Sequence, residues 1–273
     1  MEQTGLAAVC QSAEKKLSFF QSQGRYFVYA CMAGCFCSLG MALAYAMGGS
    51  FYASGALRGA YKLILGSTFT LSFTMIIFAG AELFTGNVFV FTVSVLSKKT
   101  APAASAQLVA FCYLANILGA AVMGAVVAAT GLLQGSMGDL LVTSAMTKMT
   151  LPFFQAFFRG VLCNILVCLG IWCVTKMKSE TAKLIVLLWV VLGFAGSGYE
   201  HSIANAGIFT MAMLAPQAGG AGLSLAAGLA GALHNLVPVT LGNLVGGGLC
   251  VGWVYWFAGS GKITKPEDDL PSL

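Results

Sequence analysis

The chain has 273 residues, of which 58% are hydrophobic and only 8% are charged, against roughly 25% charged residues in ordinary soluble domains. A soluble protein of this length has too little interior to bury so much apolar surface, so most of the chain must face lipid. The formal charge of +5 is small, and no basic cluster is interleaved with aromatic residues, which argues against a nucleic-acid partner.

The first 25 residues differ from the rest because Glu14, Lys15 and Lys16 interrupt their apolar positions. Apolar residues recur there at helical spacing, which predicts an amphipathic helix lying at the membrane surface. This segment, 1–25, is the first unit of the chain.

Six later segments are mostly apolar and long enough to cross a bilayer, which takes about 17–25 residues. They are 26–47, 61–96, 104–133, 151–175, 184–214 and 229–257. We therefore predict an all-α membrane protein with six transmembrane helices. Its predicted units are an N-terminal amphipathic cytoplasmic helix (1–25), a first three-helix repeat (26–133), an extracytoplasmic connection (134–150), a second three-helix repeat (151–258) and a cytoplasmic tail (259–273).

The basic residues predict the orientation. Most of them fall on one side of the predicted spans, in four groups: Lys15, Lys16 and Arg25; Lys98 and Lys99; Lys176, Lys178 and Lys183; and Lys262 and Lys265. The other side carries Arg58, Lys62 and Lys148. Because cytoplasmic loops carry an excess of Lys and Arg, both termini are predicted to be cytoplasmic. The expected location is a bacterial or archaeal cytoplasmic membrane, which the chain crosses several times.

The second and fifth spans are interrupted in the same way. Each interruption begins Phe-Ala-Gly and carries one Glu, Glu82 or Glu200, with an Asn five residues later, Asn87 or Asn205. Shorter matches, such as 114–119 with 241–246, occur in the same order in both halves. Three spans per half would place the second half upside down, as an inverted repeat, and broken helices in corresponding positions point to a transport site near the bilayer midplane.

The two glutamates are interpreted as structural groups of the interruptions. Unwound backbone leaves N–H groups unpaired, and a carboxylate accepts such bonds. Arg159 and His234, the other ionisable residues that need explaining, are interpreted as members of buried polar contacts.

His201 is interpreted differently, because it follows an interruption rich in glycine and titrates near physiological pH. A protonated His at the midplane would attract a small anion, while a core His satisfied by a carbonyl is the structural alternative. Thr85 in the opposite interruption supplies a hydroxyl, and the half-helix N-termini near Asn87 and Asn205 favour anions. The predicted pore or substrate site is therefore His201, Thr85, Asn87 and Asn205.

Large apolar residues flank these polar points, and they predict narrow gates that remove the hydration of an ion. They are Phe69, Phe73, Phe194, Leu83 and Phe84. The sequence contains no zinc-protease motif, nucleophile elbow, P-loop or dinucleotide fingerprint, so we expect neither an enzyme nor a metal or other cofactor.

Four blocks of the sequence resemble the signatures of the formate/nitrite transporter family: 80–87, 197–205, 158–164 and 235–243. The resemblance covers nearly the whole chain and implies an aquaporin-like fold of six spans in a homopentamer, with one pore per protomer. It also implies passage of small monovalent anions of weak acids, or their conjugate acids: nitrite, formate or hydrosulfide.

The resemblance assigns roles by position. His201 matches the central pore histidine and Thr85 the threonine facing it. Phe194, Phe69 and Phe73 match an outer constriction, and Leu83 with Phe84 a cytoplasmic slit. Lys16 and Lys148 are placed near the two mouths. The alternative function from a different class is an aquaporin-like pore for neutral solutes, in which His201 is structural.

Overall fold

The structure is a computed structural model, which describes residues 2–216 and 225–259. The described part is helical, and the sequence tail expected at 259–273 lies almost entirely outside it. Its elements are, in order, α1 (Glu2–Phe20), α2 (Gln23–Ala53), η1 (Arg58–Ala60), α3 (Tyr61–Met75), η2 (Ile76–Gly80), α4 (Phe84–Leu96), α5 (Pro102–Ala129), α6 (Gly135–Met149), α7 (Phe153–Lys176), α8 (Glu180–Gly196), α9 (Ser202–Leu214), α10 (Leu225–Leu244), η3 (Val245–Trp253) and α11 (Val254–Gly259).

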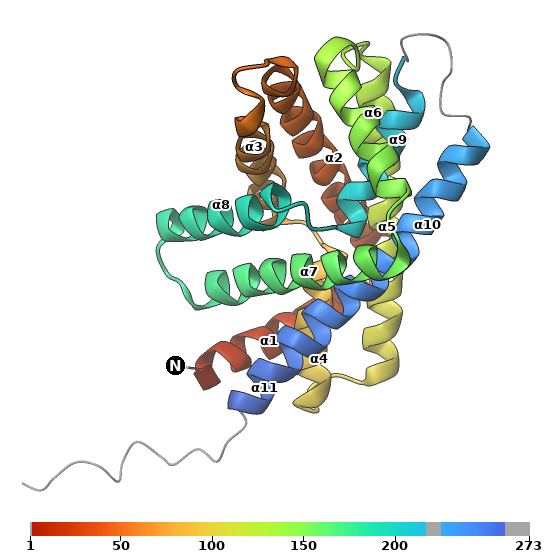
Figure 1. The fold of residues 1–273 in the computed structure, drawn as a ribbon. Helices are drawn as coiled ribbons and strands as arrows, with labels where there is room; N and C mark the ends of the chain where they lie inside the picture. Colours follow the sequence, from red (N-terminus) through yellow and green to blue (C-terminus); the bar gives the residue numbers. More distant parts are fainter. Residues whose placement is uncertain (1, 217–224, 260–273) are drawn as a thin grey trace, which may run out of the picture.

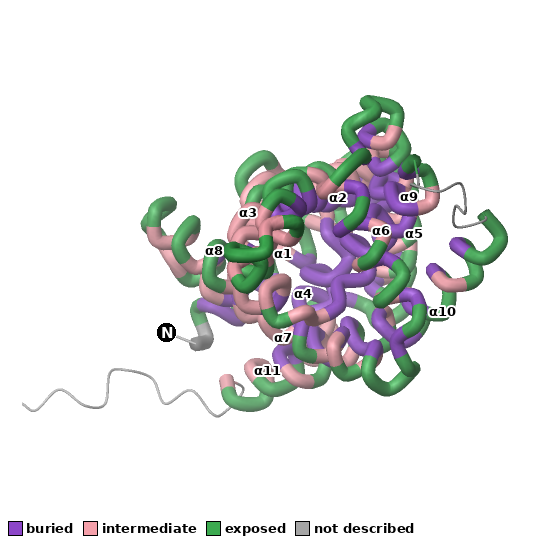
Figure 2. Tube along the Cα trace, turned by 45° about the horizontal axis from the view of Figure 1, so that its top comes forward, coloured by how far each residue is buried: buried purple, intermediate pink, exposed green. Residues whose placement is uncertain are grey.

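Within the described residues, five helices are long and apolar enough to cross a membrane. They are Gln23–Ala53, Arg58–Gly80, Pro102–Ala129, Phe153–Lys176 and Leu225–Gly259. Two shorter apolar helices, α4 and α9, lie in the interior, where most of their residues are buried. In Figure 2 the buried part of the trace gathers in the middle of the molecule and exposed segments surround it.

The two halves of the chain share one pattern of contacts. In the first half α2 packs on α3 and α5, while α4 contacts α1 and α5; in the second half α7 packs on α8 and α10, while α9 contacts α6 and α10. The segment 134–150, expected only as a connection, contains the helix α6. By these contacts α6 is the counterpart of α1, so the repeated unit begins one helix earlier than the spans alone indicate.

Small residues allow the two main helix pairs to approach closely. A β-carbon on Gly119 of α5 would overlap the carbonyl of Cys31 on α2, and one on Gly242 of α10 would overlap the carbonyl of Phe157 on α7. Close backbone approach of this kind is how helices gain packing energy where lipid removes the hydrophobic driving force. The two tightly packed pairs frame the interior in which α4 and α9 begin.

Candidate functional site

The helical segments η2 and α8 end in the two glycine-rich interruptions, and in each interruption the backbone changes direction at one glycine. Gly80 and Gly198 have φ angles of +79° and +78°, a region that favours glycine. After each glycine the chain runs extended until α4 begins at Phe84 and α9 begins at Ser202. The N–H of Glu82 donates to the carbonyl of Tyr29 and that of Glu200 to the carbonyl of Arg159, both at 3.2 Å.

One asparagine holds each interruption in place. The amide of Asn116 donates to the carbonyls of Ala30 (2.8 Å) and Glu82 (2.9 Å), and its Oδ1 accepts the N–H of Phe84 at 2.8 Å. Asn116 is fully buried. Its three bonds satisfy groups that an interrupted helix would otherwise leave unpaired.

Asn243 does the same in the other half. Its amide donates to the carbonyls of Gly160 (2.8 Å) and Glu200 (3.0 Å), and its Oδ1 accepts the N–H of Ser202 at 3.1 Å. The sequence shows Asn116 and Asn243 at matching positions of the two halves, but their role depends on backbone groups far away in the chain, which the match does not reveal.

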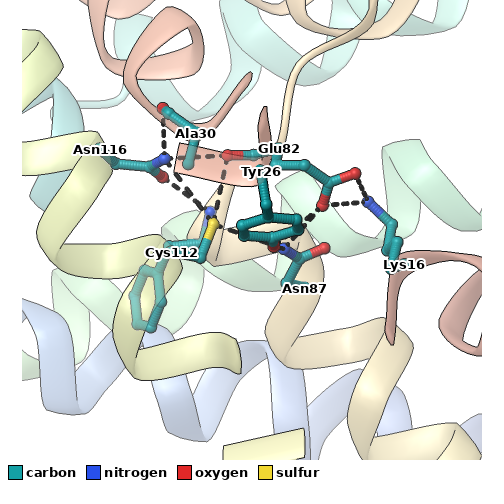
Figure 3. Close-up of polar contacts among 8 residues, drawn as sticks. Lys16, Tyr26, Ala30, Glu82, Asn87, Cys112 and Asn116 are labelled. Atoms are coloured by element: carbon teal, nitrogen blue, oxygen red, sulfur yellow. Dashed lines mark hydrogen bonds and ion pairs between the residues drawn. The ribbon is translucent and has the colours of Figure 1, made fainter. Parts of the chain in front are cut away.

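The Glu82 carboxylate binds side-chain donors rather than the backbone N–H groups expected of it (Figure 3). Lys16 Nζ lies 2.7 and 2.6 Å from its two oxygens, Tyr26 donates at 3.2 Å, and Asn87 Nδ2 donates at 3.0 Å. Asn87 also donates to the Tyr26 hydroxyl at 3.0 Å. Lys16 is therefore a partner of this buried cluster, supplied by α1.

The Glu200 carboxylate has the corresponding partners. Lys148 Nζ, from α6, lies 2.7 Å from Oε1, while Asn205 Nδ2 donates to Oε2 at 2.6 Å. Asn235 completes the cluster by donating to the Lys148 carbonyl and accepting from Asn205, both at 2.9 Å. Asn87 and Asn205, expected at the pore, are each buried and bonded to the carboxylate of their own half.

His201 and Thr85 join the two interruptions. His201 Nε2 and Thr85 Oγ1 are 3.1 Å apart, and His201 Nδ1 accepts the N–H of Ala204 at 3.3 Å. An acceptor Nδ1 places the proton of a neutral imidazole on Nε2, which then donates to Thr85. The Thr85 hydroxyl proton is left free to donate to another group.

Two vestibules and one small cavity follow the interruptions. The Lys148 vestibule, about 240 Å³, is bordered by Lys148, Glu200, Phe194 and His201. The Lys16 vestibule, about 360 Å³, is bordered by Lys16, Glu82 and Asn87. A central cavity of about 10 Å³ lies between them, near the least space that holds one water molecule.

Shared lining residues identify the walls between these spaces. Phe194 and His201 border both the Lys148 vestibule and the central cavity. Phe73, Ile76 and Leu83 border both the central cavity and the Lys16 vestibule. Two walls therefore separate the three spaces, and His201 is part of one of them.

Three of the phenylalanines expected at the gates lie in different places. Phe69 borders the central cavity and packs edge-on against Phe194, with ring centroids 6.0 Å apart. Phe73, expected at the outer constriction, lies on the other wall, beside Leu83. Phe84, expected beside Leu83 at the slit, lines neither vestibule nor the central cavity, because as the first residue of α4 it faces α5 and contacts Tyr113.

The Lys148 vestibule is also lined by Lys62 and Arg159. Among the described residues neither has an acidic partner, whereas the charge of Lys148 is offset by Glu200. This vestibule is therefore electropositive, through an arginine that the sequence alone suggested was structural. No three His, Cys, Asp or Glu side chains gather to hold a metal in the part of the chain that the structure describes.

Apolar helices of spanning length, enclosing two vestibules with a small cavity between them that His201 borders, define a membrane channel or transporter. Comparison with known proteins gives the family. The family model described as formate/nitrite transporter matches residues 3–257. This chain belongs to the formate/nitrite transporter family, and it is a multi-pass membrane protein.

Individual relatives are similar over most of their length. The uncharacterized transporter YwcJ of Bacillus subtilis is 36% identical over 258 residues, covering 94% of this chain and 98% of the relative. The nitrite transporter NirC of Escherichia coli is 34% identical, covering 89% and 87%. A solved pentameric formate channel with formate bound superposes with a TM-score of 0.75 at 30% identity, covering 88% of this chain and 98% of that one.

Proposed function

We propose that this protein conducts small monovalent anions of weak acids across the membrane, past the Thr85–His201 pair. Nitrite and formate are such anions, and hydrosulfide is another. The observation that carries the proposal is the meeting of the two vestibules at a cavity of about 10 Å³ that His201 borders. Only a molecule of a few atoms fits such a path. The relatives that are named for nitrite and formate transport support this class of substrate.

The charges in the Lys148 vestibule explain how an anion is concentrated there. Lys62 and Arg159 attract it without an offsetting carboxylate among the described residues, and low-dielectric walls strengthen that attraction. Beyond Phe194 the walls become apolar, so the anion must lose its water before it reaches the cavity. A dehydrated anion therefore needs an interaction at His201 that replaces its lost hydration.

His201 provides this interaction by changing its protonation state. In its protonated form it brings a positive charge to the cavity and attracts the anion. Transfer of one imidazolium proton to the anion breaks an N–H bond of His201, forms the O–H or S–H bond of the neutral acid, and leaves a neutral imidazole. The neutral acid crosses the apolar wall formed by Phe73 and Leu83 more readily than the anion does. Passage is accordingly pH-dependent.

The same proposal includes the membrane topology. We place α3 and η2 with α4 as one interrupted span, and α8 with α9 as the other. This gives six crossings in an inverted repeat with both termini on the cytoplasmic side. The symmetric contacts of the halves support this arrangement. A homopentamer with one pore per protomer is supported by the pentameric formate channel that the chain resembles.

The deciding experiment is uptake of formate, nitrite, hydrosulfide and chloride into proteoliposomes, at mildly acidic and at neutral pH. We expect wild-type protein to pass weak-acid anions selectively and with a pH dependence. His201→Phe should lose the pH dependence while keeping its assembly.

The control is His234→Phe, which changes the only other histidine in the sequence. His234 is exposed and contacts the carbonyl of Leu151 at 3.0 Å, away from the cavity, so its variant should behave as wild type. Unchanged pH-dependent uptake in His201→Phe contradicts the proposed role. Fast water flow without anion uptake in wild-type protein assigns the chain to the neutral-solute class.

A further inference from the structure

An open groove of about 570 Å³ belongs to neither vestibule. It lies between α4, α5 and α10, and we call it the α4–α5–α10 groove; Phe84, Phe91, Val95, Val109, Ala110 and Leu244 are among its lining residues. Its volume falls in the range of ligand sites, which is about 300–1,000 Å³.

The chemistry of the groove favours an apolar occupant. Most of its lining is aliphatic or aromatic. The hydroxyls of Tyr113 and Thr240 are bonded to each other at 2.9 Å, and that of Ser105 donates to Thr100 at 3.1 Å. These groups therefore offer few bonds to a polar ligand, and a hydrocarbon chain loses nothing by lying against them.

One end of the groove is basic. Leu96 and Pro102 line that end, and the turn between them carries Lys98 and Lys99, both exposed. The turn is fixed by bonds from the Lys98 N–H to the Val95 carbonyl (3.0 Å) and from the Lys99 N–H to the Ser94 carbonyl (2.9 Å). Neither lysine has an acidic partner among the described residues.

We infer that the α4–α5–α10 groove binds an anionic phospholipid, with an acyl chain along the groove and the phosphate at Lys98 and Lys99. An apolar groove with a pair of unpaired cations at one end matches the two parts of such a lipid, and basic pockets beside spanning helices bind anionic head groups. The charged end favours a lipid over an apolar segment of protein, because an apolar segment has no anionic group to pair with the two lysines.

The site also lies against the pore machinery. Phe84 lines the groove, packs against Tyr113 with ring centroids 4.8 Å apart, and directly follows Leu83, which borders the central cavity. The N–H of Phe84 is one of the groups held by Asn116. A bound acyl chain therefore supports the start of α4 from behind, and its loss loosens the wall at Leu83.

The test is lipid binding to the purified full-length protein by native mass spectrometry, after delipidation and titration with phosphatidylglycerol or phosphatidylcholine. Wild-type protein should prefer phosphatidylglycerol. Lys98→Gln with Lys99→Gln should bind it roughly tenfold or more weakly, since each lysine near an anionic head group contributes to affinity, and the preference over phosphatidylcholine should disappear. The double variant Lys178→Gln and Lys183→Gln removes the same charge elsewhere and should bind normally.

A second pair of variants tests the groove itself. Ala110→Trp fills it and should lose both lipids, while Gln107→Trp adds the same side chain to an exposed position of α5 outside the lining and should not. Unchanged phosphatidylglycerol binding in Ala110→Trp, or an unchanged preference in the double Lys98 and Lys99 variant, overturns the inference. Loss of the oligomer in Ala110→Trp with lipid binding intact assigns the groove to a neighbouring copy instead. Lipid binding is measured without transport, so this result is independent of the proposed function.

Discussion

The two interruptions are built alike but end on different residues. In both, an asparagine from the last helix of the half holds the Glu carbonyl and the first N–H of the half-helix, and a lysine from the first helix of the half pairs with the Glu carboxylate. The residue just before the half-helix is Leu83 in one case and His201 in the other. A symmetric scaffold thus delivers an apolar group and a titratable group to opposite walls of one cavity.

The two carboxylates also differ in exposure. The side chain of Glu200 is 2% exposed and that of Glu82 is 13% exposed. The ion pair of the second half is therefore more deeply desolvated, on the side where His201 lies. Backbone support is thus duplicated in the two halves, whereas the electrostatics of the two walls differ.

The largest effect should come from breaking what the interruptions share. Asn243→Leu leaves the carbonyls of Gly160 and Glu200 and the N–H of Ser202 unpaired. Each buried polar group without a hydrogen bond lowers the free energy of unfolding by about 1–3 kcal/mol. Asn116→Leu should be equally damaging, and both should lower the yield of folded protein and its melting temperature in detergent.

The control for these variants is Gln107→Leu, an amide-to-leucine change at an exposed position of α5. It should leave the melting temperature near that of wild type. A folded, fully stable Asn243→Leu protein would show that water or lipid replaces the asparagine, and the shared scaffold would then not rest on it.

A smaller and unequal effect should follow from removing the lysines. Breaking a buried ion pair by deleting one partner costs about 3–5 kcal/mol, and Lys148→Met approaches this because Glu200 is so little exposed. Lys16→Met should cost less, since water reaches Glu82. Thermal unfolding in detergent measures both.

The double variants sharpen this asymmetry. Adding Glu200→Gln to Lys148→Met removes the orphaned charge and should recover part of the stability, and the corresponding Glu82→Gln should recover less. Equal losses in the two single variants would contradict the difference in desolvation.

The smallest effect should come from the two turning glycines. Nothing lies within 4 Å of a β-carbon built on Gly80 or Gly198, so alanine there is penalised only by the positive φ, at about 1–2 kcal/mol. The two Gly→Ala variants should therefore lose similar melting temperature, and Gly→Asn less, because Asn tolerates this region better. A loss in one variant alone would show that the turns are not equivalent.

Much of this arrangement is predictable from sequence because it depends on local patterns. Length and apolarity mark the helices, and the Phe-Ala-Gly stretches coincide with the places where helices end, since glycine alone adopts positive φ without strain. The positions of His201 and Thr85 follow from those stretches, and the structure puts the two side chains 3.1 Å apart.

What the sequence does not reveal depends on contacts between distant residues. The pairing of Lys16 with Glu82 joins residues 66 positions apart, and no local pattern distinguishes such a lysine from a solvated one. The direction of Phe84 is set by the first turn of α4, where one residue of rotation moves a side chain from the pore to α5. The segment of α6 is predicted as a connection because its glycine and polar residues are typical of loops, although the helix supplies Lys148.

The location of these bonds has a consequence for how the chain is made. The polar network of the first interruption is complete between residues 16 and 116, and that of the second between residues 148 and 243. Because the N-terminal part of a chain is synthesised first, the first half can satisfy its buried polar groups before the second half has left the ribosome. Thr85 is one of the residues that join the two halves: its carbonyl accepts from Asn164 and its hydroxyl contacts His201. Two fragments cut between α5 and α6 would each carry an intact network, and reassembly would be needed to create the pore.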